Sequence, residues 1–544
     1  MRAPHITAPS RDSIRPPVAL IFGIGIGNGG NIVTSGIFSR FAMAGIASAT
    51  LCVAPAAHAA VTISSAATSN MSCSGGVCSP TAANAVLNVG DLTSMLASGN
   101  VTVNTGTGSL AQQVEDILVA STFNWASANA LTLDAYRSVT FTAPVAVNGA
   151  APVTLVTNDG GSGGNLLFAS GGSLSFLGTA NSLSINGAVY TLVADIHTLA
   201  NDVASAPAGN YALASSYDAS RDGTYAAAPV AATLDGAVEG LGNAITNLAV
   251  NIPANAKYKI GVGLFAQNAG RISNVTLGNL QIDVYDRCAP VGGLAGYNAG
   301  AMFGDTASGN VSSRGTFKHA GCYGFTGGLA GDNGGTILSS GSSAKVEGIS
   351  PGGLVGINSG SIALSRATGP VSSSQGSIGG LSGWNDGSGT ISQCFATGQV
   401  TGGGSYTGGL VGYNGTEDSV TAVISDSYAT GSVKGGQNVG GLSGYNGDEF
   451  QPATVEYSYS TGAGSGRYAG GLLGSAASTL IDNYWDTTTS GTRDGIPGGN
   501  IAGVTGLTSK QFRTGLPSGF DPTIWAESPD VNKGLPYLIN NPPQ

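Results

Sequence analysis

Charged residues are scarce in this sequence, and their scarcity excludes whole classes of partner. Only 9% of the residues are charged, where about a quarter is usual in soluble proteins, and the net charge is −10. Basic residues do not cluster, so we expect no nucleic-acid partner and no attraction to anionic lipid. Solubility must instead come from Ser, Thr, Asn and the backbone.

Histidine is nearly absent as well. After the leader described below, only His197 and His319 remain, and each is interpreted as an ordinary surface or hydrogen-bonded side chain. The sequence has no His-Glu-x-x-His motif and no calcium-binding nonapeptide repeat. We therefore expect no catalytic residue, no metal and no cofactor, and a protein that is not an enzyme.

Long apolar runs are missing beyond residue 59, so we expect no membrane span in the mature chain. Glycine is abundant, at 88 residues, but no Gly-x-y period occurs, which excludes collagen. Hydrophobic residues make up 42% of the chain, which is too many for a disordered protein. These exclusions indicate a folded, glycine-rich protein.

The first 59 residues are typical of an extended signal peptide. Arg2, Arg11, Arg15 and Arg40 precede apolar stretches, and Ala57-His58-Ala59 is an Ala-x-Ala cleavage site. We expect cleavage after Ala59 and an extracellular or cell-surface location; a misassigned start codon is the alternative explanation of the long leader.

Export makes disulfides plausible among the five remaining cysteines. Cys73 and Cys78 flank Ser-Gly-Gly-Val and are expected to pair. Cys288 and Cys322 lie about one repeat apart, so pairing between stacked coils is possible and depends on geometry. Cys394 is the odd one and is expected to be buried as a small apolar residue.

A short motif returns throughout the second half of the chain. Gly-Gly-Leu-Ala-Gly-Tyr-Asn at 292–298 has counterparts whose leucines lie 25 to 35 residues apart, counting from a looser copy at Leu264. The repeated leucines are Leu294, Leu329, Leu354, Leu381, Leu410, Leu442 and Leu472. The repeated asparagines are Asn298, Asn333, Asn358, Asn385, Asn414 and Asn446. Such a period predicts stacked units that bury their apolar faces against each other.

The second half of each repeat alternates with period two, as in Thr390–Val400, and no helical periodicity occurs there. We predict an all-β, right-handed parallel β-helix, or β-solenoid, with one short accessory helix. The leucines should form one internal column, and the asparagines should bond to each other from coil to coil.

These residues resemble the GLUG repeat of bacterial surface proteins, and Ser427-Tyr428-Ala429-Thr430-Gly431-Ser432-Val433 fits the same pattern. The resemblance covers about 261–486. Trp125–Ala135 and Val156–Gly161 are similar to filamentous-haemagglutinin-type exoproteins, although the Asn-Pro-Asn-Gly motifs of their secretion domain are missing. The resemblance implies an adhesin-like protein of a Gram-negative bacterium.

Four regions are expected: a leader at 1–59, a haemagglutinin-like solenoid at 60–255, a GLUG-repeat solenoid at 256–486, and a Pro- and aromatic-rich cap at 487–544 that covers the open end. Seven short strands are expected between Val101 and Ile185. Helices are expected at Asp91–Leu96 and at Asp195–Ala204, each capped by its aspartate.

One repeat position carries rings. Tyr297, Trp384, Tyr413 and Tyr445 share it, interrupted by Asp332 and Ile357. Two interpretations are open: an exposed strip that stacks on sugars or a host protein, or a ring ladder that only stabilises the turns.

The functional expectation is adhesion through the lateral face of the solenoid, with a glycan or a host or matrix surface protein as partner and an outer-membrane transporter as a possible export partner. One alternative is a lyase or glycosidase on the same scaffold, for which Asp283 and Asp286 are weak candidates because residues three apart on a strand face opposite sides. The other is a passive spacer or biofilm-matrix component.

Overall fold

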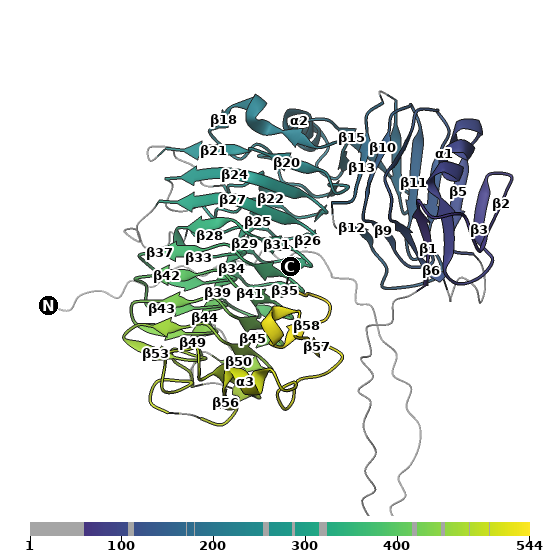
Figure 1. Cartoon of the computed structure of the whole chain (residues 1–544). Coiled ribbons are helices and arrows are strands. Elements are labelled where there is room, and N and C mark those ends of the chain that lie inside the picture. The colour runs from purple at the N-terminus through teal and green to yellow at the C-terminus, as the bar shows by residue number, and fades with distance from the viewer. Residues whose placement is uncertain are drawn as a thin grey trace, which may run out of the picture. The chain divides into compact units, whose positions relative to one another are not determined.

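In the computed structural model the chain is an all-β protein, a β-solenoid of about 13 turns with few short helices (Figure 1). The structure describes residues 59–106, 114–169, 171–178, 180–253, 260–285, 289–314, 324–415, 421–447, 452–477, 479–499 and 501–543. The predicted fold class is confirmed. No helix among these residues has the length and apolar character that a membrane crossing needs.

The first stack of coils has three parallel sheets, which differ in the number of strands. The first sheet contains β4 (Ala85–Asn88), β1 (Ala59–Ser64), β6 (Val114–Val119), β9 (Val139–Phe141) and β12 (Leu166–Phe168). The second contains β7 (Phe123–Trp125), β10 (Pro144–Val147) and β13 (Ser173–Phe176). The third contains β5 (Val101–Asn104), β8 (Leu131–Asp134), β11 (Pro152–Val156) and β14 (Ser182–Ile185). The seven expected strands are all present to within one residue at each end.

A hairpin ends the first stack. β14 pairs with β15 (Ala188–Val193) in the antiparallel direction, whereas nearly all other pairs are parallel. Asn186 and Gly187 form its turn with positive φ of 49° and 79°, the geometry that favours an Asn-Gly two-residue turn. The apolar core also divides here, into one cluster centred on 61–185 and another on 193–504. The predicted boundary at 255 does not coincide with this division.

The second stack follows from β15 through β16 (Asn210–Leu213) and β19 (Ala237–Glu239) into the repeats. One repeat makes one coil of five short strands: β38 (Ser377–Gly379), β39 (Ser382–Asn385), β40 (Thr390–Ser392), β41 (Phe395–Ala396) and β42 (Val400–Gly402). Each pairs in parallel with its counterpart in the next coil.

Stacked counterparts form the sheets of this body. The strands aligned with β39 are β22 (Phe265–Asn268), β25 (Ala295–Asn298), β29 (Ala330–Asn333), β34 (Val355–Asn358), β44 (Val411–Asn414) and β49 (Ser443–Asn446). Those aligned with β40 include β23 (Arg271–Ser273), β26 (Ala301–Phe303), β30 (Thr336–Leu338), β35 (Ser361–Ala363), β45 (Ala422–Ser425), β50 (Ala453–Glu456) and β54 (Thr479–Ile481). Those aligned with β38 are β28 (Phe325–Gly327), β33 (Ile349–Gly352), β43 (Tyr406–Gly408), β48 (Asn438–Gly440) and β53 (Tyr468–Gly470).

The 18-stranded sheet forms one lateral face. Its strands in the repeats, besides β41 and β42, are β24 (Thr276–Val284), β27 (Thr306–Ser313), β31 (Gly341–Ser342), β32 (Lys345–Glu347), β36 (Arg366–Ala367), β37 (Val371–Ser373), β46 (Tyr428–Ala429), β47 (Val433–Lys434), β51 (Tyr459–Ser460), β52 (Gly464–Ser465), β55 (Asn483–Asp486) and β56 (Val504–Leu507). Its exposed positions include polar residues such as Gln281 and Thr401 and charged residues such as Lys345 and Lys434.

The repeated leucines form the predicted internal column. All seven are 0% exposed, and the backbone N–H of each leucine from Leu294 to Leu442 donates to the leucine carbonyl of the next coil at 2.8–2.9 Å. The paired glycines before each leucine have no positive φ. They are required because a Cβ at Gly379 or Gly380 would collide with the carbonyl oxygens of Ser382 and Gly409.

The repeated asparagines form the predicted ladder, which starts one coil earlier, at Asn268. Each Nδ2 donates to the Oδ1 of the next asparagine at 2.6–2.8 Å, through to Asn446. All seven side chains are buried. The chain of bonds leaves Asn268 Oδ1 and Asn446 Nδ2, at its two ends, without partners in the described chain.

A second ladder runs through the turn before the 18-stranded sheet. Ser340, Ser365, Ser427 and Ser458 each accept a backbone N–H from the preceding coil and donate to the carbonyl two residues back. Cys394 takes the same position, and its thiol donates to the Ser392 carbonyl. The cysteine is buried, as predicted, but it replaces a serine in a hydrogen-bonded ladder and is not only apolar filling.

Three α-helices are present in the described chain, two of them in the segments where helices were expected. α1 (Val89–Ser98) is capped by Asn88, one turn earlier than the predicted cap Asp91. α2 (Ile196–Ser205) is capped by Asp195 as predicted and buries Ile196, Leu199 and Val203 in the second core. α3 (Ser509–Phe512) begins the tail.

The C-terminal tail, residues 508–543, lies against the side of the solenoid and not across its end (Figure 1). The final rung is β56, which pairs with β55. After it, Phe512, Phe520 and Trp525 pack on rings that project from the 18-stranded sheet. These rings, called here the flank aromatics, are Phe395, Tyr428, Tyr459 and Tyr484. The predicted end cap is therefore mainly a flank cover.

The predicted Cys73–Cys78 disulfide is present. It joins β2 (Met71–Ser74) to β3 (Val77–Pro80) across a turn in which Gly75 and Gly76 have positive φ. Cys288 and Cys322 lie outside the described residues.

Candidate functional site

The predicted aromatic column is present in the strands aligned with β39. Tyr297, Trp384, Tyr413 and Tyr445 occupy one register position, with Asp332 and Ile357 between the first two. The rings of Trp384 and Tyr413 stack with centroids 4.8 Å apart, and those of Tyr413 and Tyr445 are 4.7 Å apart. The sequence prediction of shared register is thus correct.

Two of the four rings in this column are buried, while Tyr297 and Trp384 are partly exposed. Tyr413 and Tyr445 are each 8% exposed, because they cover each other's faces and Tyr406 of β43 packs against both. Asp332 is also largely buried, which raises the pKa of its carboxyl to about 6. Ligand stacking needs a free ring face, so for Tyr413 and Tyr445 the geometry favours the stabilising ladder over the exposed strip.

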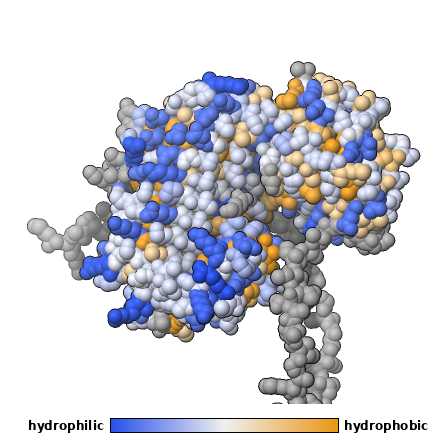
Figure 2. Space-filling view, viewed as in Figure 1, coloured by the Kyte–Doolittle hydropathy of each residue, from blue (hydrophilic) through white to orange (hydrophobic). Residues whose placement is uncertain are grey.

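An elongated groove lies elsewhere on the solenoid, between the C-terminal tail and the 18-stranded sheet. We call it the tail groove. Its volume is about 710 Å³, with Thr397, Thr430 and Thr461 on one side and Arg513 and Lys533 on the other. A second cavity of about 320 Å³ shares Thr397 and Pro543 with it and continues to Thr368. Figure 2 shows hydrophilic side chains gathered over the tail around α3 and β57 (Trp525–Ala526).

The threonines of the tail groove form a column with one residue per coil: Thr368, Thr397, Thr430 and Thr461. Each directly follows a residue of the 18-stranded sheet and uses its backbone N–H in the coil-to-coil ladder. None of the four hydroxyls bonds to a described residue. Neighbouring strands in a sheet are about 4.8 Å apart, so the groove presents an unsatisfied hydroxyl at every rung.

The charged side chains of the tail groove are held in place. Arg513 Nε donates to the Lys533 carbonyl at 3.0 Å, which positions the guanidinium at the exposed wall. The carboxylate of Asp486 accepts from the Thr488 and Thr489 N–H groups and from Ser509 Oγ. Asp486 therefore serves the structure of the turn and has little capacity left for acid or base chemistry.

Sequence reasoning missed the tail groove. Its threonines belong to the Ser-Tyr-Ala-Thr-Gly pattern already recognised as part of the repeat, so their recurrence was visible. Only the position of the tail, which creates the other wall, shows that this column is the one that lines a groove.

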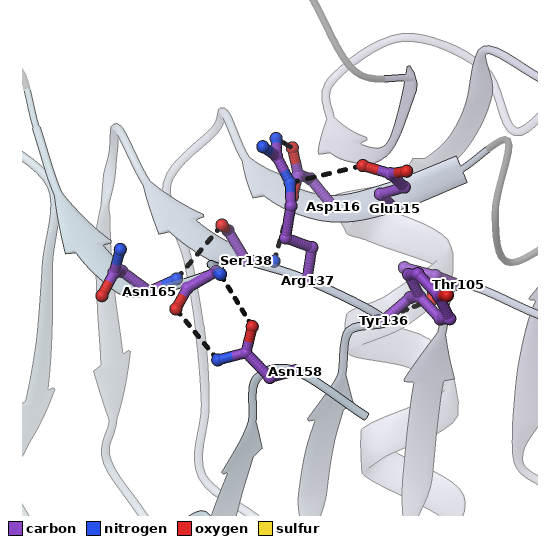
Figure 3. Close-up of polar contacts among 9 residues, drawn as sticks. Thr105, Glu115, Asp116, Tyr136, Arg137, Ser138, Asn158 and Asn165 are labelled. Atoms are coloured by element: carbon purple, nitrogen blue, oxygen red, sulfur yellow. Dashed lines mark hydrogen bonds and ion pairs between the residues drawn. The ribbon is translucent and has the colours of Figure 1, made fainter. Parts of the chain in front are cut away.

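The densest cluster of acids and bases in the first stack is shown in Figure 3. Arg137 bonds Asp116 through Nε at 3.0 Å and lies 3.4 Å from Glu115 Oε2. Asp116 also accepts from the Ser138 N–H, and Asn158 closes its own turn by two bonds with Gly164. Both carboxylates thus contact the same guanidinium, which offsets one of their two negative charges, and this is the arrangement of a structural ion-pair cluster and not of a free acid and base.

Other predicted candidates are not brought together. Asp283 on β24 faces Arg314 at 3.2 Å, while Asp286 lies outside the described residues. His197 is 65% exposed and 3.7 Å from Asp222, as expected of a surface histidine, and His319 is again outside the described ranges. Within the described chain no group of three His, Cys, Asp or Glu side chains could hold a metal ion.

Comparison with family models identifies the GLUG motif in this chain. The GLUG motif model matches residues 374–401 and 403–434, which are the coil of β38–β42 and the coil that follows it. A search of curated proteins finds no match. The matched segments contain Thr397 and Thr430, so two of the four hydroxyls in the threonine column lie within the motif itself.

Proposed function

We propose that this protein is an exported, adhesin-like surface or secreted protein that binds a linear glycan along the tail groove, with no bond-making step. The GLUG motif and the solenoid fold are compatible with a surface adhesin-like or a structural protein. The observation that carries the finer proposal is the column of threonine hydroxyls that have no partner in the described chain and open into a groove.

The spacing of the column supports a sugar polymer. One hydroxyl recurs about every 4.8 Å along the stack, and one sugar ring is about as long as one coil is thick. An extended peptide along the same direction repeats its side chains on one face about every 6.6 Å and would lose register with the threonines within two coils. Neutral hydroxyls beside Arg513 and Lys533 suit a polymer rich in hydroxyl groups, with or without acidic substituents.

Export is supported by two features. Cys73–Cys78 is a disulfide, and disulfides persist in oxidising compartments outside the cytosol. The leader carries the composition of a secretory signal. A partner transporter in the outer membrane remains part of the proposal.

The alternative enzymatic function needs two free carboxylates on one face of a groove. The tail groove is lined by two carboxylates, Asp486 and Asp530. Asp486 is engaged by three donors, so the groove does not offer two free carboxylates, and we favour binding over a lyase or glycosidase reaction.

The test removes threonine hydroxyls from the tail groove without changing the shape of the side chains. In a chain starting near Ala60, the double variant Thr397→Val and Thr430→Val keeps the branched side chains and removes two hydrogen-bonding groups. If each bond contributes about 1 kcal/mol, affinity for a glycan selected on a glycan array should fall about thirtyfold. Melting temperature should be unchanged, since neither hydroxyl bonds to a residue that the structure describes.

The control is Thr401→Val on β42, which is exposed on the same sheet outside the groove. Its affinity should equal that of the unaltered chain. If the double variant binds the glycan as tightly as the unaltered chain does, the tail groove is not the glycan-binding site. Binding to no glycan on the array would favour the passive spacer or matrix role.

A further inference from the structure

A second polar pocket lies away from the tail groove, lined by residues of both stacks. Its volume is about 430 Å³, within the range of small-molecule sites. Four side chains of different elements reach it: Asn165 before β12, Tyr190 of β15, Glu239 of β19 and Arg271 of β23. We call it the Glu239 pocket.

Neighbouring residues hold the carboxyl of Glu239 in one orientation. Its Oε1 accepts from the Leu241 N–H at 3.1 Å and from Asn274 Nδ2 at 2.9 Å. Asn274 in turn donates to the Leu166 carbonyl of the first stack. No described residue bonds to Oε2, which leaves that oxygen for a ligand.

Arg271 is positioned on the same side. Its Nε donates to Ser273 Oγ at 2.7 Å, and its guanidinium carbon lies 5.8 Å from the centre of the Phe303 ring. The terminal nitrogens bond to no described residue, and the side chain is exposed. The hydroxyl of Tyr190 and the side-chain amide of Asn165 are likewise without partners in the described chain. Four polar groups thus converge on the cavity with unused hydrogen-bonding capacity.

The charges in this pocket depend on pH. Burial raises the pKa of Glu239 to about 7, against the lowering effect of its two hydrogen bonds and of Arg271. Burial also raises the pKa of Tyr190, and the negative charge of Glu239 raises it further. Asp305, fully buried nearby, has a pKa well above its ordinary value for the same reason. As pH falls through about 7, Glu239 therefore loses its negative charge while Arg271 keeps its positive charge.

We propose that the Glu239 pocket binds an acidic sugar residue, a hexuronic acid, with its carboxylate on Arg271 and its hydroxyls on Asn165, Tyr190 and Glu239. Arginine matches a carboxylate by paired N–H donors. The amide, phenol and carboxyl groups match hydroxyls, which an acidic peptide side chain would leave unused. The inference does not rest on the tail groove.

The test is calorimetric titration of the chain from about Ala60 with three probes: a hexuronic acid trimer, the neutral hexose trimer of the same linkage, and triglutamate. We expect the uronic trimer to bind at least tenfold more tightly than the other two. Arg271→Ala should reduce its affinity at least tenfold, and Arg221→Ala, which removes another arginine that lies over a tyrosine ring, should not change it.

The pH dependence separates this site from a merely basic surface. The ligand carboxylate stays ionised from pH 6 to pH 8, while Glu239 loses its negative charge as pH falls. Affinity should therefore rise about tenfold from pH 8 to pH 6, because one repulsive charge is removed near the ligand. Glu239→Gln should bind at pH 8 as the unaltered chain binds at pH 6.

Melting curves of each variant show whether it is folded, and Arg271→Gln, which keeps the stem over Phe303, replaces Arg271→Ala if the latter melts early. Equal binding of the neutral trimer or of triglutamate would overturn the proposal, and so would full affinity in both Arg271 variants or an unchanged pH profile in Glu239→Gln. Thr397→Val with Thr430→Val should leave uronate binding intact, so failure of one site is distinguishable from failure of the other.

Discussion

Replacing Asn385 with leucine should lower the free energy of unfolding by about 5 kcal/mol. Asn385 Oδ1 accepts from Asn358, and its Nδ2 donates to Asn414 Oδ1 and to the Gly389 and Val423 carbonyls. Leucine has nearly the same size, so no cavity forms. It leaves several buried polar groups with fewer partners, each at a cost of about 1–3 kcal/mol.

Urea unfolding followed by circular dichroism measures the effect, and hydrogen exchange locates it in the coils that contain β34, β39 and β44. The matched control is Asn310→Leu on β27, a partly exposed asparagine whose side chain makes no hydrogen bond to the described residues, with an expected change within about 0.5 kcal/mol. A loss below about 1 kcal/mol in Asn385→Leu would mean that the ladder adds little to stability.

Replacing Trp525 with alanine should detach the tail while leaving the coils folded. Trp525 is 1% exposed, stacks on Phe520 at 4.6 Å, and donates from Nε1 to Asp426 Oδ1 at 3.1 Å. Truncating a buried tryptophan costs about 3–5 kcal/mol. This free-energy cost weakens the packing of the tail on the solenoid and leaves the coil-to-coil ladders unchanged.

Hydrogen exchange should therefore speed up over residues 508–543 and stay slow in the leucine column, and a dye that binds apolar surface should detect the uncovered flank aromatics. Tyr468→Ala is the control, because this ring is 46% exposed and lies on the solenoid itself. Since the tail forms one wall of the tail groove, glycan affinity should also fall in Trp525→Ala although the threonine column is intact. Retained protection of the tail would contradict this account of its docking.

The two ladders explain why a chain with few charges can form a stable rod of stacked coils. Backbone groups are satisfied by the next coil, and buried Asn and Ser side chains repeat the same bond at each rung. Identical residues at identical positions make this possible, because an amide or a hydroxyl both donates and accepts. The ladder tolerates Cys394 in place of a serine since a thiol has the same two capacities in weaker form.

Much of the fold could be predicted because its determinants are local and repeated. The leucine and asparagine positions recur with the period of one coil, so their columns follow from position alone. The Cys73–Cys78 bond and the helix capped by Asp195 also depend on residues close in sequence. The aromatic column was placed in the correct register, but its exposure was not predictable, because Tyr406, which covers it, comes from a neighbouring sheet.

The sequence by itself determined the coil: its length, its inward leucine, its glycine corners and its hydrogen-bonded asparagine, since each depends on spacing within one repeat. Only the tertiary structure decided where the surfaces meet. The tail docks on the flank because Phe395, Tyr428, Tyr459 and Tyr484 become one apolar strip after the coils stack. The Glu239 pocket exists because the hairpin at Asn186–Gly187 ends one stack and starts another, which brings Asn165 and Arg271 together across more than a hundred residues of chain.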